Sequence, residues 1–180
     1  MMRLKLKVFV ILFLTLLSGN SDIMRKIILS IICVFSALAA FAQPRALGVR
    51  LSTECLVSYE HQIGADADFL EVDMGYELIG LVNVAGAYNF MIVQPEWTRK
   101  GSWGFYAGPA AKIGGAGIGF YIALGAQAGL EYNFEFPLQV SLDVRPTIGC
   151  AFISGTPSFY AGGAIFGGLP SLSVRYRFGR

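Results

Sequence analysis

The sequence predicts an all-β protein, an eight-stranded antiparallel up-and-down β-barrel that crosses a membrane. Hydrophobic residues make up 54% of the chain and charged residues only 14%, whereas charged residues form about 25% of ordinary soluble domains. No run of about 18 uncharged apolar residues follows residue 45, so this part of the sequence offers no spanning helix. Apolar and polar residues instead alternate with period two, which is typical of strands with one apolar face.

The first 42 residues are predicted to be a leader, and residues 43–180 the barrel domain. Met24-Arg25-Lys26 opens a basic and apolar segment that ends in Ala40-Phe41-Ala42. A short basic region, an apolar run and a small-residue A-x-A site form a secretory signal peptide. We therefore expect translation to start at Met24, cleavage to follow Ala42, and the chain to be exported through the inner membrane. An uncleaved N-terminal anchor is the alternative, although its apolar run is too short to span a bilayer.

The formal net charge of +2 comes from the leader region. Beyond residue 42 the chain keeps nine basic and eleven acidic residues. Nucleic-acid binding needs a clustered basic face, so we expect no nucleic-acid partner.

Turn residues divide the remainder into eight predicted strands. They are residues 45–52, 55–64, 68–77, 79–92, 102–113, 120–134, 138–152 and 172–178. Polar segments at 65–67, 94–101 and 135–137 are predicted turns, residues 114–119 a glycine-rich loop, and residues 154–168 the longest loop.

The first four strands alternate clearly. In the first, Leu47, Val49 and Leu51 share one face and Arg50 lies on the other. The next three place large apolar residues opposite Ser58 and Glu60, then Glu71 and Asp73, then Asn83 and Asn89. Each therefore has one strongly apolar and one polar or small-residue face.

The last four strands follow the same rule. The fifth is the least regular, because Pro109 would remove a ladder hydrogen bond in mid-strand. The sixth and seventh alternate around Gln127 and Asp143, and the last sets Leu172, Val174, Tyr176 and Phe178 against Ser173, Arg175 and Arg177. We expect this last strand to pair with the first and close the barrel.

Alternation alone does not say which face is outside, since a soluble lipocalin-like barrel would show the inverse arrangement. An eight-stranded barrel has an interior just wide enough for side chains. The apolar face carries large residues at nearly every position, whereas the polar face is rich in glycine, alanine and serine. The sequence thus favours the apolar face outside, with the long 154–168 loop on the side opposite the N-terminus, as in outer-membrane barrels.

The inward charges nearly balance, which predicts a closed lumen plugged by ion pairs. Buried charges are tolerated when they are paired and hydrogen-bonded, and arginine can bind a carboxylate with two hydrogen bonds. The predicted network consists of Arg50, Lys112, Arg145, Arg175 and Arg177 against Glu60, Glu71, Asp73, Glu131 and Asp143.

Several stretches resemble a known family. They are Leu47-Gly48-Val49-Arg50, Ser58-Tyr59-Glu60-His61, Tyr106-Ala107-Gly108, Gly129-Leu130-Glu131-Tyr132-Asn133-Phe134, Pro137-Leu138-Gln139-Val140-Ser141-Leu142-Asp143-Val144-Arg145-Pro146 and Val174-Arg175-Tyr176-Arg177-Phe178. With these the chain resembles the small outer-membrane β-barrel proteins of Gram-negative bacteria, which are OmpA/OmpX-like in size. The resemblance implies the fold and an outer-membrane location, but no activity. It also implies that Tyr176 and Phe178 belong to a signal read by the outer-membrane assembly machinery.

Candidate chemistry is sparse. His61 lies near Ser58 and Glu60, but strand parity points it away from them, so a nucleophile–base pair cannot form within this strand. Cys55 and Cys150 fall on non-neighbouring strands and are expected to be free thiols. Residues 114–119 lack the G-K-[ST] of a phosphate-binding loop.

We therefore expect a monomeric, non-catalytic barrel without cofactor or metal, surrounded by outer-membrane lipid. Its role would be structural, envelope-stabilising or surface-binding. A lipid-modifying barrel enzyme and a small-solute channel are the alternatives.

Overall fold

The computed structural model describes residues 44–63, 67–77, 81–117, 119–163 and 169–178. The predicted leader, its start at Met24 and its cleavage after Ala42 lie outside the described residues. No described helix is long and apolar enough to cross a membrane. The described secondary structure is all β, and its strands are β1 (Pro44–Leu51), β2 (Glu54–Gln62), β3 (Phe69–Glu77), β4 (Val82–Val93), β5 (Ser102–Ala116), β6 (Gly119–Asn133), β7 (Leu138–Val144), β8 (Thr147–Ile153), β9 (Thr156–Gly162) and β10 (Ser171–Arg177).

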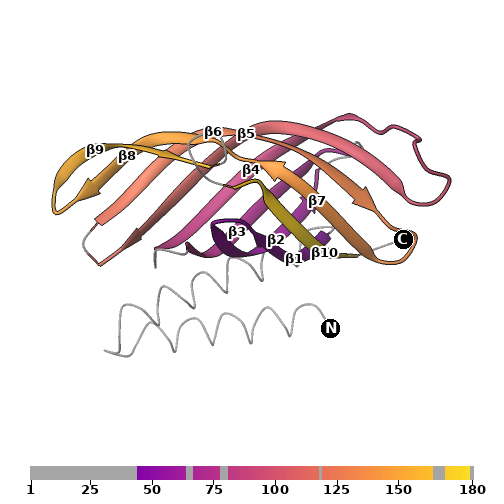
Figure 1. The fold of residues 1–180 in the computed structure, drawn as a ribbon, viewed down its shortest axis with the longest axis horizontal. Helices are drawn as coiled ribbons and strands as arrows, with labels where there is room; N and C mark the ends of the chain where they lie inside the picture. Colours follow the sequence, from indigo (N-terminus) through magenta and orange to yellow (C-terminus); the bar gives the residue numbers. More distant parts are fainter. Residues whose placement is uncertain (1–43, 64–66, 78–80, 118, 164–168, 179–180) are drawn as a thin grey trace, which may run out of the picture. The chain divides into compact units, whose positions relative to one another are not determined.

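Eight of these strands close into an antiparallel barrel (Figure 1). Around the ring they follow the order β1, β2, β3, β4, β5, β6, β7 and β10, and β10 pairs with β1 through Val49↔Val174. Closure of the last strand onto the first is therefore confirmed. We call the end with the β2–β3, β4–β5 and β6–β7 connections the terminal end, and the opposite end the hairpin end.

The predicted seventh strand, residues 138–152, is wrong as a single element. It divides at Arg145-Pro146 into β7, which pairs with β10, and β8, which pairs with the first half of β6. Proline has no N–H for a ladder and restricts the residue before it. The carbonyl of Pro146 still accepts a hydrogen bond from Ala126 N at 3.2 Å, so the two pieces stay in line along β6.

The predicted long loop at 154–168 is also wrong, because much of it is strand β9. Ser154 and Gly155 form a tight turn with φ of 50° and 82°, and β9 folds back along β8. Two positive φ values suit a hairpin because they match the twist of its strands. Residues 154–162 of the expected long loop therefore form a hairpin with β8. Residues 164–168 of that loop lie outside the described residues.

One further sequence expectation is corrected, because the loop at 114–119 is largely strand: β5 runs to Ala116 and β6 begins at Gly119. The irregularity expected at Pro109 is present. Pro109 pairs with Ala126 of β6, but the β4–β5 ladder is interrupted beside it, between Ala87↔Ala110 and Phe90↔Ala107. Proline is tolerated where the partner strand does not need its N–H.

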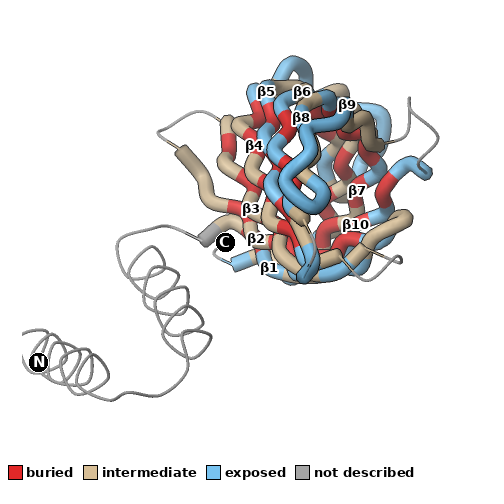
Figure 2. The backbone as a smooth tube through the Cα atoms, turned by 90° about the vertical axis from the view of Figure 1, so that its left-hand side faces the viewer, coloured by how far each residue is buried: buried red, intermediate tan, exposed pale blue. Residues whose placement is uncertain are grey.

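Burial alternates along the strands, and the polarity is inverted relative to a soluble domain. Figure 2 shows buried and more exposed positions alternating along the backbone. On β10, Leu172 and Val174 are 47% and 40% exposed, whereas Ser173 and Arg175, which alternate with them, are 0% and 1% exposed. Among the described residues, nineteen buried side chains are polar or charged and nine are hydrophobic. The large apolar side chains therefore face outward and the charges inward.

The closure between β1 and β10 should depend on Gly48. A Cβ there would overlap the Val174 carbonyl and crowd the backbone of Arg175, whereas a Cβ at Gly86 of β4 would meet only the Glu71 carbonyl oxygen, at 3.8 Å. We expect Gly48→Ala to destabilise the barrel by roughly 1–3 kcal/mol through overpacking. Gly86→Ala, the matched control, should be neutral or stabilise by up to about 1 kcal/mol. Urea unfolding followed by circular dichroism measures both, and equal effects would contradict this account of the closure.

Candidate functional site: the charged lumen

The centre of the lumen is organised around the carboxylate of Glu71, on β3. Its Oε1 accepts hydrogen bonds from Arg50 Nη1 at 3.1 Å, Arg145 Nη2 at 2.8 Å and Arg175 Nη2 at 3.0 Å. Its Oε2 accepts one from Gln127 Nε2 at 2.9 Å. Arg50 and Arg175 come from β1 and β10, Gln127 from β6, and Arg145 directly follows β7. One fully buried carboxylate on β3 thus joins segments from across the barrel.

Two aspartates complete this central cluster. Arg50 Nη1 and Arg145 Nη1 lie 3.1 and 2.6 Å from Asp73 Oδ2. Arg50 Nη2 donates to Asp143 and, at 2.9 Å, to Ser171 Oγ. Because each guanidinium bridges several acceptors, it spreads its positive charge over more than one buried carboxylate.

Towards the terminal end the network continues through Arg175. Its Nη1 lies 3.0 Å from Glu60 Oε1, and it donates to Ser58 and Ser141 at 2.9 and 2.8 Å. Beyond it, Arg45 bridges two acids, with Nη1 3.6 Å from Glu60 Oε2 and Nη2 donating to Glu131.

Other side chains at the terminal end contact Arg45 and Glu131. Glu131 also accepts hydrogen bonds from Asn133 and Gln139, both at 2.8 Å. The Arg45 guanidinium carbon lies 4.0 Å from the centre of the Phe69 ring, a favourable cation–π position. The ion pairs of the central cluster and the terminal end therefore form one connected set that runs from Asp143 to Glu131.

At the hairpin end a smaller cluster surrounds Lys112. Its Nζ contacts Glu54 and lies 3.0 Å from Glu77 Oε1. Glu54 and Glu77 face each other across β2 and β3, where two like charges would repel without a cation between them. Tyr121 donates to Glu77, and Asn83 to both acids at 3.3 and 3.2 Å.

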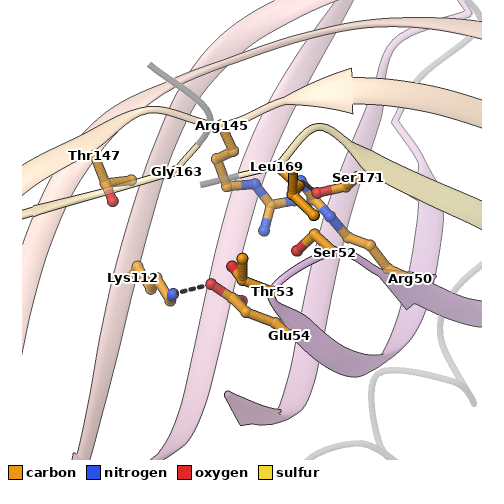
Figure 3. Close-up of a pocket in the computed structure, with 10 residues that line it drawn as sticks. All are labelled: Arg50, Ser52, Thr53, Glu54, Lys112, Arg145, Thr147, Gly163, Leu169 and Ser171. Atoms are coloured by element: carbon orange, nitrogen blue, oxygen red, sulfur yellow. Dashed lines mark hydrogen bonds and ion pairs between the residues drawn. The ribbon is translucent and has the colours of Figure 1, made fainter. Parts of the chain in front are cut away.

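A small cavity separates this cluster from the central one. Figure 3 shows Lys112 and Glu54 on one side and Arg50 and Arg145 on the other, with Ser171 beside Arg50. Its volume is about 20 Å³, room for one water molecule. The cavity is too small for an organic substrate.

The structure places these predicted lumen residues in ion pairs: Arg50, Glu60, Glu71, Asp73, Lys112, Glu131, Asp143, Arg145 and Arg175. Arg177, also predicted to face the lumen, is half-buried at the end of β10 opposite Ala46. Tyr176 and Phe178, the predicted assembly signal, are 55% and 38% exposed, and their ring centres lie 5.2 Å apart.

Sequence reasoning missed three charged residues of the lumen. Glu54 and Glu77 share the inward parity of β2 and β3, so a stricter count along each strand identifies them. Arg45 gave no such signal, because its parity is that of outward-facing Leu47. The register of β1 with β2 shifts between Pro44 and Ala46, and a bulge of this kind turns a side chain to the other face.

The remaining sequence candidates do not assemble into a site. Ser58 is fully buried against Arg175, whereas the His61 ring stacks on Tyr59 at 6.5 Å between centres. Cys55 and Cys150 are exposed free cysteines, as predicted. Within the described ranges, no group of three or more histidine, cysteine, aspartate or glutamate side chains could hold a metal ion.

Comparison with protein-family models, with curated proteins and with solved structures found no match to this chain.

The central cluster predicts that the single substitution Glu71→Gln strongly destabilises the folded barrel. Glu71→Gln keeps the shape of the side chain but leaves three buried arginines short of one negative charge. Removing one partner of a buried ion pair costs about 3–5 kcal/mol. Glu96→Gln, at an exposed glutamate, is the control and should change stability by less than about 0.5 kcal/mol. If urea unfolding of the two variants coincided, the lumen pairs would not stabilise the fold.

Proposed function

We propose that this protein is an integral outer-membrane β-barrel with a closed, ion-paired lumen, and that its role is structural or surface-binding rather than catalytic. The observation that carries the proposal is the inverted polarity of the barrel. Arginine and glutamate fill the interior, whereas leucine, valine, isoleucine and phenylalanine cover the exterior.

The exterior supports a lipid environment. Exposed large hydrophobic side chains lie on all eight strands of the ring, including Tyr76 on β3, and also on β8 and β9, so the apolar surface extends around the ring. Soluble monomers rarely expose contiguous apolar patches larger than a few hundred Å². In a bilayer the same apolar surface contacts hydrocarbon. The closed ladder also pairs the backbone N–H and C=O groups, for which lipid offers no hydrogen-bond partners.

Aromatic side chains at the terminal end also support a lipid environment. Tyr132 packs against Trp103 with 4.6 Å between ring centres, and against Phe134 at the same distance. Phe134 in turn contacts Phe136. Tryptophan and tyrosine are enriched where a membrane meets water, so this cluster fits one interface of a bilayer.

The interior supports a plug rather than a pore. Arg145 and Arg175 reach the Glu71 carboxylate of β3 from positions several strands away around the ring, as Arg50 does from β1. Outer-membrane location, export by the leader and assembly through Tyr176 and Phe178 are parts of the same proposal. No specific observation favours the enzyme or channel alternatives.

Membrane integration is tested by a charge on the outer face. Val174 lies in the middle of β10 and is outward-facing, and an arginine at the bilayer midplane of a barrel costs roughly 2–4 kcal/mol. We expect the wild-type chain in the outer-membrane fraction, with heat-modifiable gel migration, and a large loss of the folded band for Val174→Arg. Gln94→Arg, in the exposed 94–101 segment, is the control. A soluble periplasmic location for the wild-type chain would overturn the proposal.

The closed lumen makes a separate prediction. Purified protein in a planar bilayer should show no steady single-channel conductance, because paired side chains cross the lumen. Large and stable conductance steps would instead favour the solute-channel alternative.

A further inference from the structure

The ion pairs of the lumen contain more acids than cations. The pairs that the structure describes involve five cations and seven acids: Arg45, Arg50, Lys112, Arg145 and Arg175, and Glu54, Glu60, Glu71, Asp73, Glu77, Glu131 and Asp143. Counting the half-buried Arg177 as a further cation still leaves the acids in excess. A buried charge without a counter-charge is so costly that the group is neutralised instead. We therefore expect at least one of these acids to carry a proton.

Glu60 is the acid whose negative charge is least stabilised by hydrogen bonds. It is 0% exposed, and neither of its carboxyl oxygens has a hydrogen-bond partner. Each of the other six acids accepts at least one hydrogen bond from a described side chain. Hydrogen bonds to a buried carboxylate favour its charged form, and their absence favours the neutral acid. Glu60 is therefore the first candidate for the proton.

The two cations near Glu60 are also paired with other acids. Arg175 Nη1 lies 3.0 Å from Glu60 Oε1, but Arg175 Nη2 donates to Glu71 at the same distance. Arg45 Nη1 lies 3.6 Å from Glu60 Oε2, whereas Arg45 Nη2 donates to Glu131. Because Glu71 and Glu131 each receive a hydrogen bond from the arginine that they share with Glu60, the positive charges are better placed for these two acids.

The other titratable groups that face Glu60 add no positive charge. Glu71 lies directly opposite on β3, and like charges in that position repel each other. Glu131 of β6 shares Arg45 with Glu60. Tyr106 of β5 also interacts electrostatically with Glu60, but a phenol is neutral below about pH 10. A proton on Glu60 thus removes its repulsion with both neighbouring glutamates.

We propose that Glu60 is a neutral carboxylic acid in the folded barrel, and that loss of its proton weakens the ion-paired plug. In the unfolded chain Glu60 is an ordinary glutamate that ionises near pH 4.3. Above this pH the folded state binds one proton more than the unfolded state, so stability falls as pH rises until the folded barrel also releases the proton. The plug is therefore a pH-sensitive element. The inference goes beyond the proposed function, because the same groups fill the lumen in detergent and in lipid.

Glu60→Gln tests the proposal, because glutamine keeps the shape of the neutral acid and cannot ionise. Urea unfolding in detergent micelles is followed by circular dichroism at several pH values. The ratio of the wild-type unfolding constant to that of the variant should rise up to tenfold between about pH 5 and about pH 6. At about pH 7 the variant should be at least as stable as the wild type, whereas Glu71→Gln, the matched control, should be less stable. A ratio that does not rise with pH, or a loss of stability equal to that of Glu71→Gln, would overturn the proposal.

Infrared spectroscopy detects the proton itself, because the C=O stretch of a neutral carboxyl group absorbs at a higher frequency than a carboxylate. At about pH 6 exposed glutamates are ionised, so a neutral-acid band reports buried groups. We expect this band in the wild-type protein, with a loss of intensity in Glu60→Gln and no change in Glu96→Gln, at an exposed glutamate. A wild-type spectrum without the band, or a band that Glu60→Gln leaves unchanged, would contradict a proton on Glu60.

Discussion

The contact on which the rest of the structure depends is the one between Glu71 and three arginines. Burying charge in a narrow barrel is unfavourable unless each charge is paired and hydrogen-bonded. Glu71 Oε1 satisfies this condition for Arg50, Arg145 and Arg175 at once, with distances of 2.8–3.1 Å. Because these residues come from strands far apart in the sequence, their pairing requires the ring to close.

The volume that charged and amide side chains take up inside the barrel determines which side chains face outward. A small barrel has little internal volume, and here charged and amide side chains fill it. The large apolar residues must then face outward, where Leu172, Val174 and their neighbours form a hydrocarbon surface. At the terminal end, the packed rings of Trp103, Tyr132 and Phe134 give that surface an aromatic edge. The paired interior, the apolar exterior and the aromatic edge are thus linked features of one barrel.

Much of this fold follows from alternation in the sequence. Period-two patterns locate the eight ring positions, their faces and the β1–β10 closure, because one residue of slippage would exchange interior and exterior. They do not reveal β9, whose glycine, proline and serine content is typical of a loop, nor the break at Pro146. Arg45 was equally hidden, because its inward turn depends on a local bulge. Parity predicts which charges face inward, but the partner of each arginine depends on distances across the lumen.

The central claim is that the apolar face meets hydrocarbon, and the free cysteines on that face allow it to be measured directly. A spin label on Cys55 or Cys150, in chains where Cys33 and the other thiol are replaced by serine, reports its surroundings in lipid vesicles. This account predicts strong relaxation by oxygen, which dissolves in hydrocarbon, and weak relaxation by a water-soluble nickel chelate. Labels that respond to the nickel chelate as freely as a water-exposed site would contradict it.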